Sequence, residues 1–165
     1  MAEDVTDRVL GGWGAARPDF EMDPLRVTAR LSRIGPLLAR RQDEVFSRFG
    51  LSRSEVGMLS ALRIAGPPHR LSPGRLGRGL MMSSAGITGR TDRLERRGLV
   101  RRLPDPHDRR GVIVELTDEG LEAVDGAVRA VTVSDQQLLE RFDAAEMASL
   151  EGLLRKLLAG LELPD

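Results

Sequence analysis

The sequence predicts a mainly α-helical fold that carries one small antiparallel β-hairpin. Three observations lead to this prediction. Apolar residues recur at spacings of three and four along most of the chain, capping residues stand where those periods begin, and only residues 100–103 and 112–116 are β-prone. The chain has 165 residues, 41% of them hydrophobic, which suits one core of ordinary size. We therefore expect six helices and one hairpin in a single globular unit.

Composition excludes several classes of protein. The absence of cysteine rules out disulfides, thiol redox sensing and cysteine-ligated zinc, and favours a reducing, cytoplasmic setting. No apolar run approaches the roughly 18 residues of a membrane span, and the N-terminus has no signal-peptide pattern, so we expect no membrane partner. Neither a catalytic serine–histidine motif nor a phosphate-binding glycine loop is present. We expect no enzymatic activity and no cofactor.

The first two segments differ in regularity. Residues 1–22 are rich in Gly, Asp and Arg without an apolar period, which predicts a mobile N-terminal arm. Residues 23–50 read as a dimerisation helix that begins at Asp23-Pro24, an acidic cap followed by proline at the first helical position. Gly35-Pro36 lies in its middle and is expected to kink or split it.

Residues 51–116 are expected to form three short helices and the hairpin. A capping box from Ser52 to Glu55 opens one helix, Ser72-Pro73 opens the next, and Ser83 caps the third, over residues 83–97. The two strands that follow flank a turn-rich tip at residues 104–111.

Helix 83–97 has two distinct faces. With Ile87 at the centre of the buried face, 100° per residue places Thr91 and Leu94 beside it. The opposite face is small in its first turns and basic later, and it carries Ala85, Thr88, Gly89, Asp92, Arg93 and Arg96, with Gly86 at its edge. A glycine inside a helix costs about 1 kcal/mol relative to alanine, so the two glycines indicate a need for small side chains there.

Residues 117–165 read as two C-terminal dimerisation helices. Thr117 caps the first, whose apolar residues fall on a near-heptad seam, and a capping box from Asp143 to Glu146 opens the second. Their apolar surface exceeds what a small core needs. A homodimer interface is one explanation, and packing back onto the chain's own core is the other.

The net charge of zero hides an asymmetry. Residues 1–62 carry 9 basic and 9 acidic side chains, residues 63–110 carry 12 and 4, and residues 111–165 carry 4 and 12. Nearly all of the basic residues are arginines, since Lys156 is the single lysine. A basic middle segment favours contact with a polyanion, although a solvated charge run is the plain alternative.

Helix, turn, helix and hairpin together form a winged helix-turn-helix, whose second helix fits the major groove of double-stranded DNA. An arginine at the hairpin tip can enter the minor groove, and Asp108 beside Arg109 and Arg110 can hold one guanidinium in place. The expected DNA-binding residues are Arg75, Ser83, Ser84, Ala85, Thr88, Gly89, Arg90, Arg93, Arg96, Arg109 and Arg110, with Asp108 as the orienting partner.

The run from Leu51 to Gly120 resembles the MarR family of transcriptional regulators. The resemblance is carried by LSPGRL, by SSAGITGRTDRLERRGLV and above all by DRRGVIVELTDEG. It implies a homodimeric repressor on a palindromic operator, with helix 83–97 in the major groove and the wing at residues 104–111 in the minor groove. It also implies that Arg110 is the minor-groove arginine, that Asp108 orients it and that Arg109 contacts phosphate.

The family resemblance further implies a small anionic or aromatic effector that releases the DNA. Candidate residues for such a site are Arg33, Leu37, Arg40, Met58 and Leu62. The alternative that the residues favour is that the arginines of this helix form a solvated face and that Met58 belongs to the core. Tyrosine is absent and aromatic residues make up 3% of the chain, which leaves little for a stacking pocket.

Two rival readings remain. Asp105, His107 and Asp108 cluster at the hairpin tip, but an exposed turn without a fourth ligand is a poor metal site, so we expect no metal. The second rival is a helical dimer of the same fold that binds another protein and no DNA. The acidic C-terminal third is compatible with that reading, whereas the basic middle argues against it.

Overall fold

The computed structural model describes residues 3–106, 108 and 111–162. The described residues form seven helices, namely α1 (Val5–Ala16), α2 (Asp23–Ser47), α3 (Arg53–Ile64), α4 (Pro73–Gly79), α5 (Ser84–Arg96), α6 (Asp118–Leu139) and α7 (Ala144–Leu161). They also form three short strands, β1 (Arg70–Leu71), β2 (Val100–Pro104) and β3 (Val112–Leu116). The predicted class, mainly α with a small antiparallel sheet, is confirmed, although six helices were expected.

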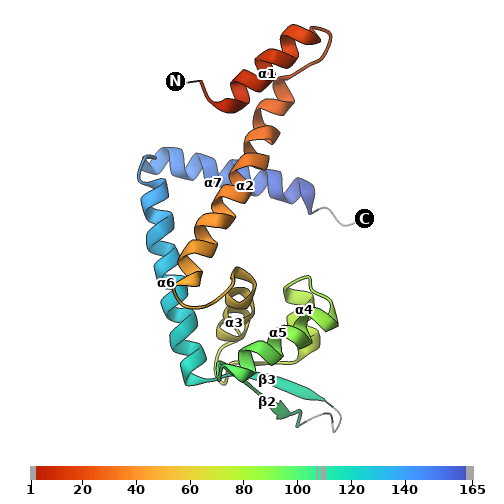
Figure 1. Ribbon diagram of the computed structural model, residues 1–165, viewed down its shortest axis with the longest axis vertical. Coiled ribbons are helices and arrows are strands. Elements are labelled where there is room, and N and C mark those ends of the chain that lie inside the picture. Colours follow the sequence, from red (N-terminus) through yellow and green to blue (C-terminus); the bar gives the residue numbers. More distant parts are fainter. Residues whose placement is uncertain (1–2, 107, 109–110, 163–165) are drawn as a thin grey trace.

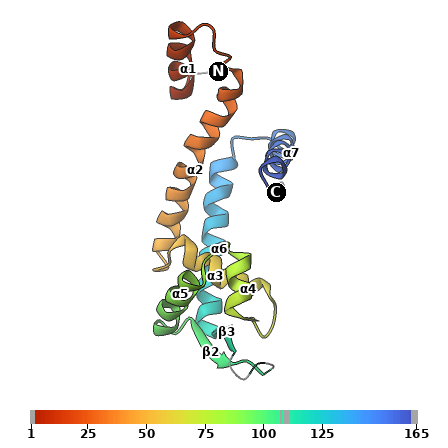
Figure 2. The same ribbon diagram turned by 90° about the vertical axis from the view of Figure 1, so that its right-hand side faces the viewer.

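A compact body and two long helical struts make up the molecule. Helices α3, α4 and α5 gather around the sheet at one end, while α2 and α6 lead away from it (Figure 1). Helix α1 lies at the far end of α2, and α7 follows the far end of α6. In the second view α7 stands apart from α2, so their crossing in the first view is not a contact (Figure 2).

The hydrophobic core lies in the compact body and at the base of the struts. Helices α3, α4, α5 and α6 and strands β2 and β3 each contribute to it, and its fully buried members include Met58, Leu59, Leu62, Leu76, Ile87, Leu94, Val100, Val114 and Val124. Burial of this apolar surface is the main force that fixes α5 against α4 and β2. The placement of α5 is therefore decided by its buried face.

The helix starts follow the capping chemistry of the sequence. Ser52 and Glu55 form a reciprocal capping box at α3, and the hydroxyls of Ser72, Ser83 and Thr117 accept backbone N–H groups at α4, α5 and α6. Asp143 and Glu146 form the capping box of α7. These predicted caps are confirmed. Helix α2 differs, because its cap is Met22 without a side-chain bond, and Asp23 lies inside the first turn.

The sheet has a third strand that the sequence did not predict. Its order is β1-β3-β2, all antiparallel, with Val100 paired to Leu116 and Pro104 to Val112 across the hairpin. Strand β1 is two residues long and follows His69, whose φ is 60°. A strand of that length has no readable alternation.

A glycine permits the close join between the sheet and α6. A Cβ at Gly120 would lie 2.0 Å from the Leu99 carbonyl oxygen and 2.8 Å from a Leu116 methyl carbon. The same carbonyl accepts the Thr117 N–H at 3.2 Å. The first turn of α6 therefore sits directly on the chain that enters β2.

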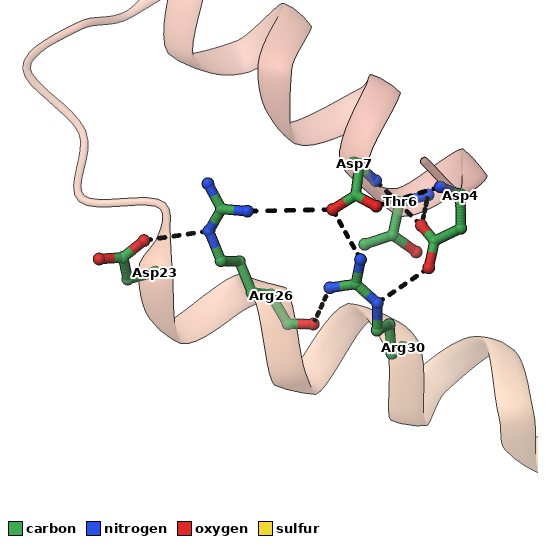
Figure 3. A network of polar contacts seen from close by, with 6 residues as sticks. All are labelled: Asp4, Thr6, Asp7, Asp23, Arg26 and Arg30. Atoms are coloured by element: carbon green, nitrogen blue, oxygen red, sulfur yellow. Dashed lines mark hydrogen bonds and ion pairs between the residues drawn. The ribbon is translucent and has the colours of Figure 1, made fainter. Parts of the chain in front are cut away.

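Within the segment 1–22, which the sequence predicted to be a mobile arm without an apolar period, Val5–Ala16 forms a helix that was not expected. The Asp4 carboxylate caps it, and both Asp4 and Asp7 bind the Arg30 guanidinium of α2, at 2.9 Å and 2.6 Å (Figure 3). Within α1, the side chains of Thr6 and Leu10 are buried. Gly11, Gly12 and Gly14 obscure the apolar period in the sequence, and the partner contacts that hold the helix come from α2, outside the segment.

Helix α2 runs continuously from Asp23 to Ser47 with Pro36 inside it, so the helix is not split at Gly35-Pro36, and the kink expected there stays a prediction. A proline removes one backbone donor and disfavours a regular helix, but a 25-residue helix retains enough other bonds to continue. No helix among the described residues has the length and apolar character needed to cross a membrane.

Candidate nucleic-acid interface

Helix α5 presents one buried and one exposed face, as the sequence predicted. Ile87, Thr91 and Leu94 are buried, and the Thr91 hydroxyl donates to the Ile87 carbonyl at 2.8 Å. Ser83, Ser84, Ala85, Thr88, Arg93 and Arg96 are exposed, while Gly89 is half-buried. A Cβ at Gly89 would meet no atom of the described residues within 4 Å. The protein itself therefore does not require glycine at that position.

The arginines of α5 divide into two kinds. Arg93 and Arg96 are exposed, with the Arg93 guanidinium 3.8 Å from Glu55 and Arg96 donating to the Asp92 carbonyl at 3.2 Å. Arg90 instead turns back to Met82 in the α4–α5 turn, and its Nε is buried without a hydrogen-bond partner among the described residues. Arg93 and Arg96 are thus available to a partner on the exposed face, whereas Arg90 is not presented in the same way.

Glu55 ties α5 to the start of α3. Burial alone would raise the pKa of its carboxyl, but hydrogen bonds from Ser52 and the charges of Arg97 and Arg93 lower the pKa below its ordinary value. Arg97 also donates to the Gly50 carbonyl at 2.9 Å. The C-terminal part of α5 is therefore anchored to the turn between α2 and α3. The S-x-x-E spacing predicts Glu55 as part of the capping box of α3 and gives no sign of its contacts with Arg93 and Arg97.

Arg75 is exposed in the first turn of α4. It borders a hollow of about 320 Å³ between α4 and the tip end of the hairpin, which is lined by Arg70, Leu71, Ser72, Arg75, Leu103, Pro104, Asp105, Pro106 and Ile113. Arg75, the predicted DNA-binding residue of α4, is thus on the side of α4 that faces the hairpin.

The hairpin tip closes through backbone bonds around a glycine. The Asp105 N–H donates to the Gly111 carbonyl at 3.0 Å, and the Gly111 N–H donates to the Asp108 carbonyl at 2.8 Å. A Cβ at Gly111 would lie 2.8 Å from the Asp105 Cβ, so only glycine fits. Asp108 is exposed. His107, Arg109 and Arg110 lie outside the described residues, so their predicted roles stay predictions.

The five proposed effector residues are not brought together. Leu37 and Arg40 line a groove of about 390 Å³ between α2 and α6, with Ile34, Leu38, Arg41, Glu44 and Leu138. Met58 and Leu62 are 0% exposed within the core of the compact body, and Arg33 is exposed on α2 outside that groove. Met58 and Leu62 cannot contact a ligand at the surface, because the apolar face of α3 is packed into the core.

The described residues contain no group of three His, Asp or Glu side chains that could hold a metal ion. His69 lies in a turn with its Nδ1 3.2 Å from the Arg63 carbonyl.

Helix α4, its turn, α5 and the β2–β3 hairpin form a winged helix-turn-helix, the class of fold that holds a recognition helix beside a hairpin wing. The particular family follows from comparison with known proteins. The family model described as "MarR family" matches residues 49–111. The HTH-type transcriptional regulator PecS of Dickeya dadantii is 36% identical over 151 residues, which cover 92% of this chain and 90% of PecS. The chain belongs to the MarR family.

Other relatives extend this result. The multiple antibiotic resistance protein MarR of Escherichia coli strain K12 is 32% identical over 72% of this chain and 81% of its own. A mutant E. coli MarR complexed with operator DNA superposes with a TM-score of 0.70 at 28% identity, over 85% of this chain and 99% of that one. Sco3205, a MarR family regulator of Streptomyces coelicolor in complex with DNA, gives 0.75 at 25% identity, over 87% and 91%.

Proposed function

We propose that this protein is a homodimeric, sequence-specific DNA-binding transcriptional regulator that represses from a palindromic operator. One observation carries the proposal: the exposed face of α5 combines small residues with Arg93 and Arg96 beside a hairpin wing. Small side chains let a helix backbone approach base edges, and arginines farther along reach the phosphates. Relatives with this fold have been solved on operator DNA.

The N-terminal turn of α5 adds backbone donors to this surface. Ser83 caps the helix and binds the Gly86 N–H at 3.2 Å, and Ser84 and Ala85 are exposed in the same turn. The first N–H groups of a helix have no intrahelical partner and favour an anion such as phosphate. Because the proposed partner is DNA, we expect the protein to work in the cytoplasm.

The homodimer accounts for the apolar surface of the terminal helices. Within α7, all of which is described, no side chain is buried, and Leu153 and Leu161 are 68% and 77% exposed. Helix α2 likewise exposes Leu25 and Val27 near its start. An apolar helix left in water is unfavourable by about 25 cal/mol per Å² of apolar area. A second copy that covers α2 and α7 removes this cost and fixes the spacing of two α5 helices.

A small-molecule effector would meet the dimer at the groove between α2 and α6. Its apolar wall is formed by Ile34, Leu37 and Leu138. Arg40 lies 3.6 Å from Glu44, while Arg41 donates to the hydroxyl and carbonyl of Ser134, both at 2.8 Å. An amphipathic anion suits this mixture of charge and apolar surface. Binding there would change how α2 meets α6, and hence the spacing of the two wings.

The test is a titration of fluorescent duplex DNA with the purified protein at several salt concentrations. If about six phosphates are neutralised per dimer, the logarithm of the association constant should fall with a slope near −5 against the logarithm of salt. Arg93→Ala removes one cation from each of the two subunits and should therefore reduce the magnitude of that slope by about two, whereas Arg8→Ala on the exposed surface of α1 should leave it unchanged. Absent or salt-independent binding would favour the rival function, a protein-interaction module of the same fold.

A further inference from the structure

A single arginine of the hairpin ties the wing to α5. The two terminal nitrogens of Arg102 in β2 reach different carboxylates, Asp92 at 2.5 Å and Glu95. The Arg102 N–H also donates to the Glu95 carboxylate, at 2.9 Å. Three bonds therefore join one residue of β2 to the C-terminal half of α5.

The contacts of Arg102 with Asp92 and Glu95, here called the Arg102 clamp, require a guanidinium. Its planar fork presents several donors in fixed directions, so one side chain can hold two carboxylates at once. The Arg102 side chain is 31% exposed, compared with 50% for Asp92. A partly shielded, multiply bonded group restrains geometry more than an ordinary surface ion pair does.

The Arg102 clamp also offsets negative charge on α5. Asp92 and Glu95 are the acidic residues of that helix, and both lie in the half that carries Arg93 and Arg96. Unbalanced carboxylates beside a phosphate backbone repel it. Arg102 offsets part of that charge and directs both carboxylates toward the hairpin.

The neighbouring arginine has a different role. Successive side chains of a strand point to opposite faces, and Arg101 accordingly binds Glu115 at 2.6 Å within the sheet. Glu115 is buried and also binds Arg70 at 2.7 Å. Arg101 and Arg102 therefore carry the same charge on the same strand, but only Arg102 holds α5.

We propose that Arg102 is a positioning residue that fixes the wing relative to α5, so that the two engage the major and minor grooves in one register. This inference rests on the proposed DNA-binding function. Without the clamp, α5 and the wing can each still contact DNA, but their relative position is no longer fixed. The affinity for the preferred duplex sequence should therefore fall more than the affinity for random DNA.

The experiment compares Arg102→Ala with the matched variant Arg101→Ala. The probes are the duplex that the wild-type protein selects from a random-sequence library, and a scrambled duplex of equal length. Both variants lose one positive charge and should lose similar affinity for the scrambled duplex. Arg102→Ala should lose about tenfold more affinity for the selected duplex than Arg101→Ala does, on the scale of one base contact.

Arg102→Lys separates positioning from charge. Lysine restores the positive charge but not the planar guanidinium. Arg102→Lys should therefore recover less than half of the affinity for the selected duplex that Arg102→Ala loses, measured on a logarithmic scale. Hydrogen exchange of the free protein gives a readout independent of DNA, with amides of residues 91–96 exchanging faster in Arg102→Ala and not in Arg101→Ala.

Two outcomes overturn different claims. If the wild-type protein selects and binds no duplex, the proposed function fails. If it binds, and Arg101→Ala and Arg102→Ala lose equal affinity for the selected duplex, or lysine restores it fully, the positioning role alone is wrong.

Discussion

Gly89 offers a substitution whose effects on stability and on DNA binding should have opposite signs. It lies inside α5 on the exposed face, and a Cβ built there meets no described atom within 4 Å. Alanine is favoured over glycine in a helix interior by about 1 kcal/mol. With no steric cost to set against this gain, Gly89→Ala should stabilise the free protein by about 1 kcal/mol per chain.

For a chain of this length, that gain corresponds to a rise in Tm of roughly 2–4 °C. The affinity for operator DNA should instead decrease, because a side chain at residue 89 holds the backbone of α5 away from the base edges. Gly89→Gln, which adds a longer side chain, should cost about tenfold or more in affinity for the selected duplex, the scale of one lost base contact. Gly89→Ala should cost less.

The assay pairs thermal unfolding followed by circular dichroism with fluorescence anisotropy on the selected duplex. Gly12→Ala is the matched control, since Gly12 is an exposed helical glycine of α1 with nothing described within 4 Å of its built Cβ. It should raise Tm and leave DNA affinity unchanged. If Gly89→Gln binds the duplex as tightly as wild type, the close-approach explanation is refuted, and if Gly89→Ala lowers Tm, the glycine is structural.

Three other outcomes are expected. Gly120→Ala should destabilise the fold by about 3 kcal/mol or more in denaturant unfolding, because its Cβ would lie 2.0 Å from a backbone oxygen; a loss below about 1 kcal/mol would contradict the packing. The pKa of Asp4 is lowered, chiefly by the Asp7 backbone N–H, and the pKa of Asp7 is lowered, chiefly by Arg30. Depressed pKa values stabilise α1 above the ordinary value of 3.8, and this stabilisation is lost as the pH falls through the folded values. Trp13, the single tryptophan, should therefore change its emission in acid, and an unchanged emission would refute this linkage. Arg110→Ala should weaken operator binding strongly while leaving Tm and dimer mass unchanged, and normal binding would refute the wing assignment.

Local signals predicted most of the central fold. Ser52, Ser72, Ser83 and Thr117 stand at the starts of their helices because capping depends on residues three positions away at most. The 3.6-residue period likewise identified Ile87, Thr91 and Leu94 as the buried face of α5. Such features can be read from sequence because their causes lie within a few residues.

Long-range contacts decided what the sequence did not predict. Helix α1 is glycine-rich, and it is held by Arg30, which lies 23 residues beyond Asp7. Strand β1 exists because residues 70–71 pair with β3, more than 40 residues away. The Arg102 clamp joins two elements whose separate patterns give no sign of it. Met58 is 0% exposed, which agrees with its interpretation as a core residue and does not support a ligand contact there.

In the proposed complex, a homodimer places two α5 helices and two wings on one duplex in a fixed register. Footprinting on the selected duplex measures that register. We predict guanine N7 protection in two major-groove segments about one helical turn, roughly 10 base pairs, apart on a pseudo-palindrome, each with adjoining minor-groove protection from hydroxyl radicals. A single unsymmetrical footprint, or major-groove protection without the minor-groove signal, would contradict the account.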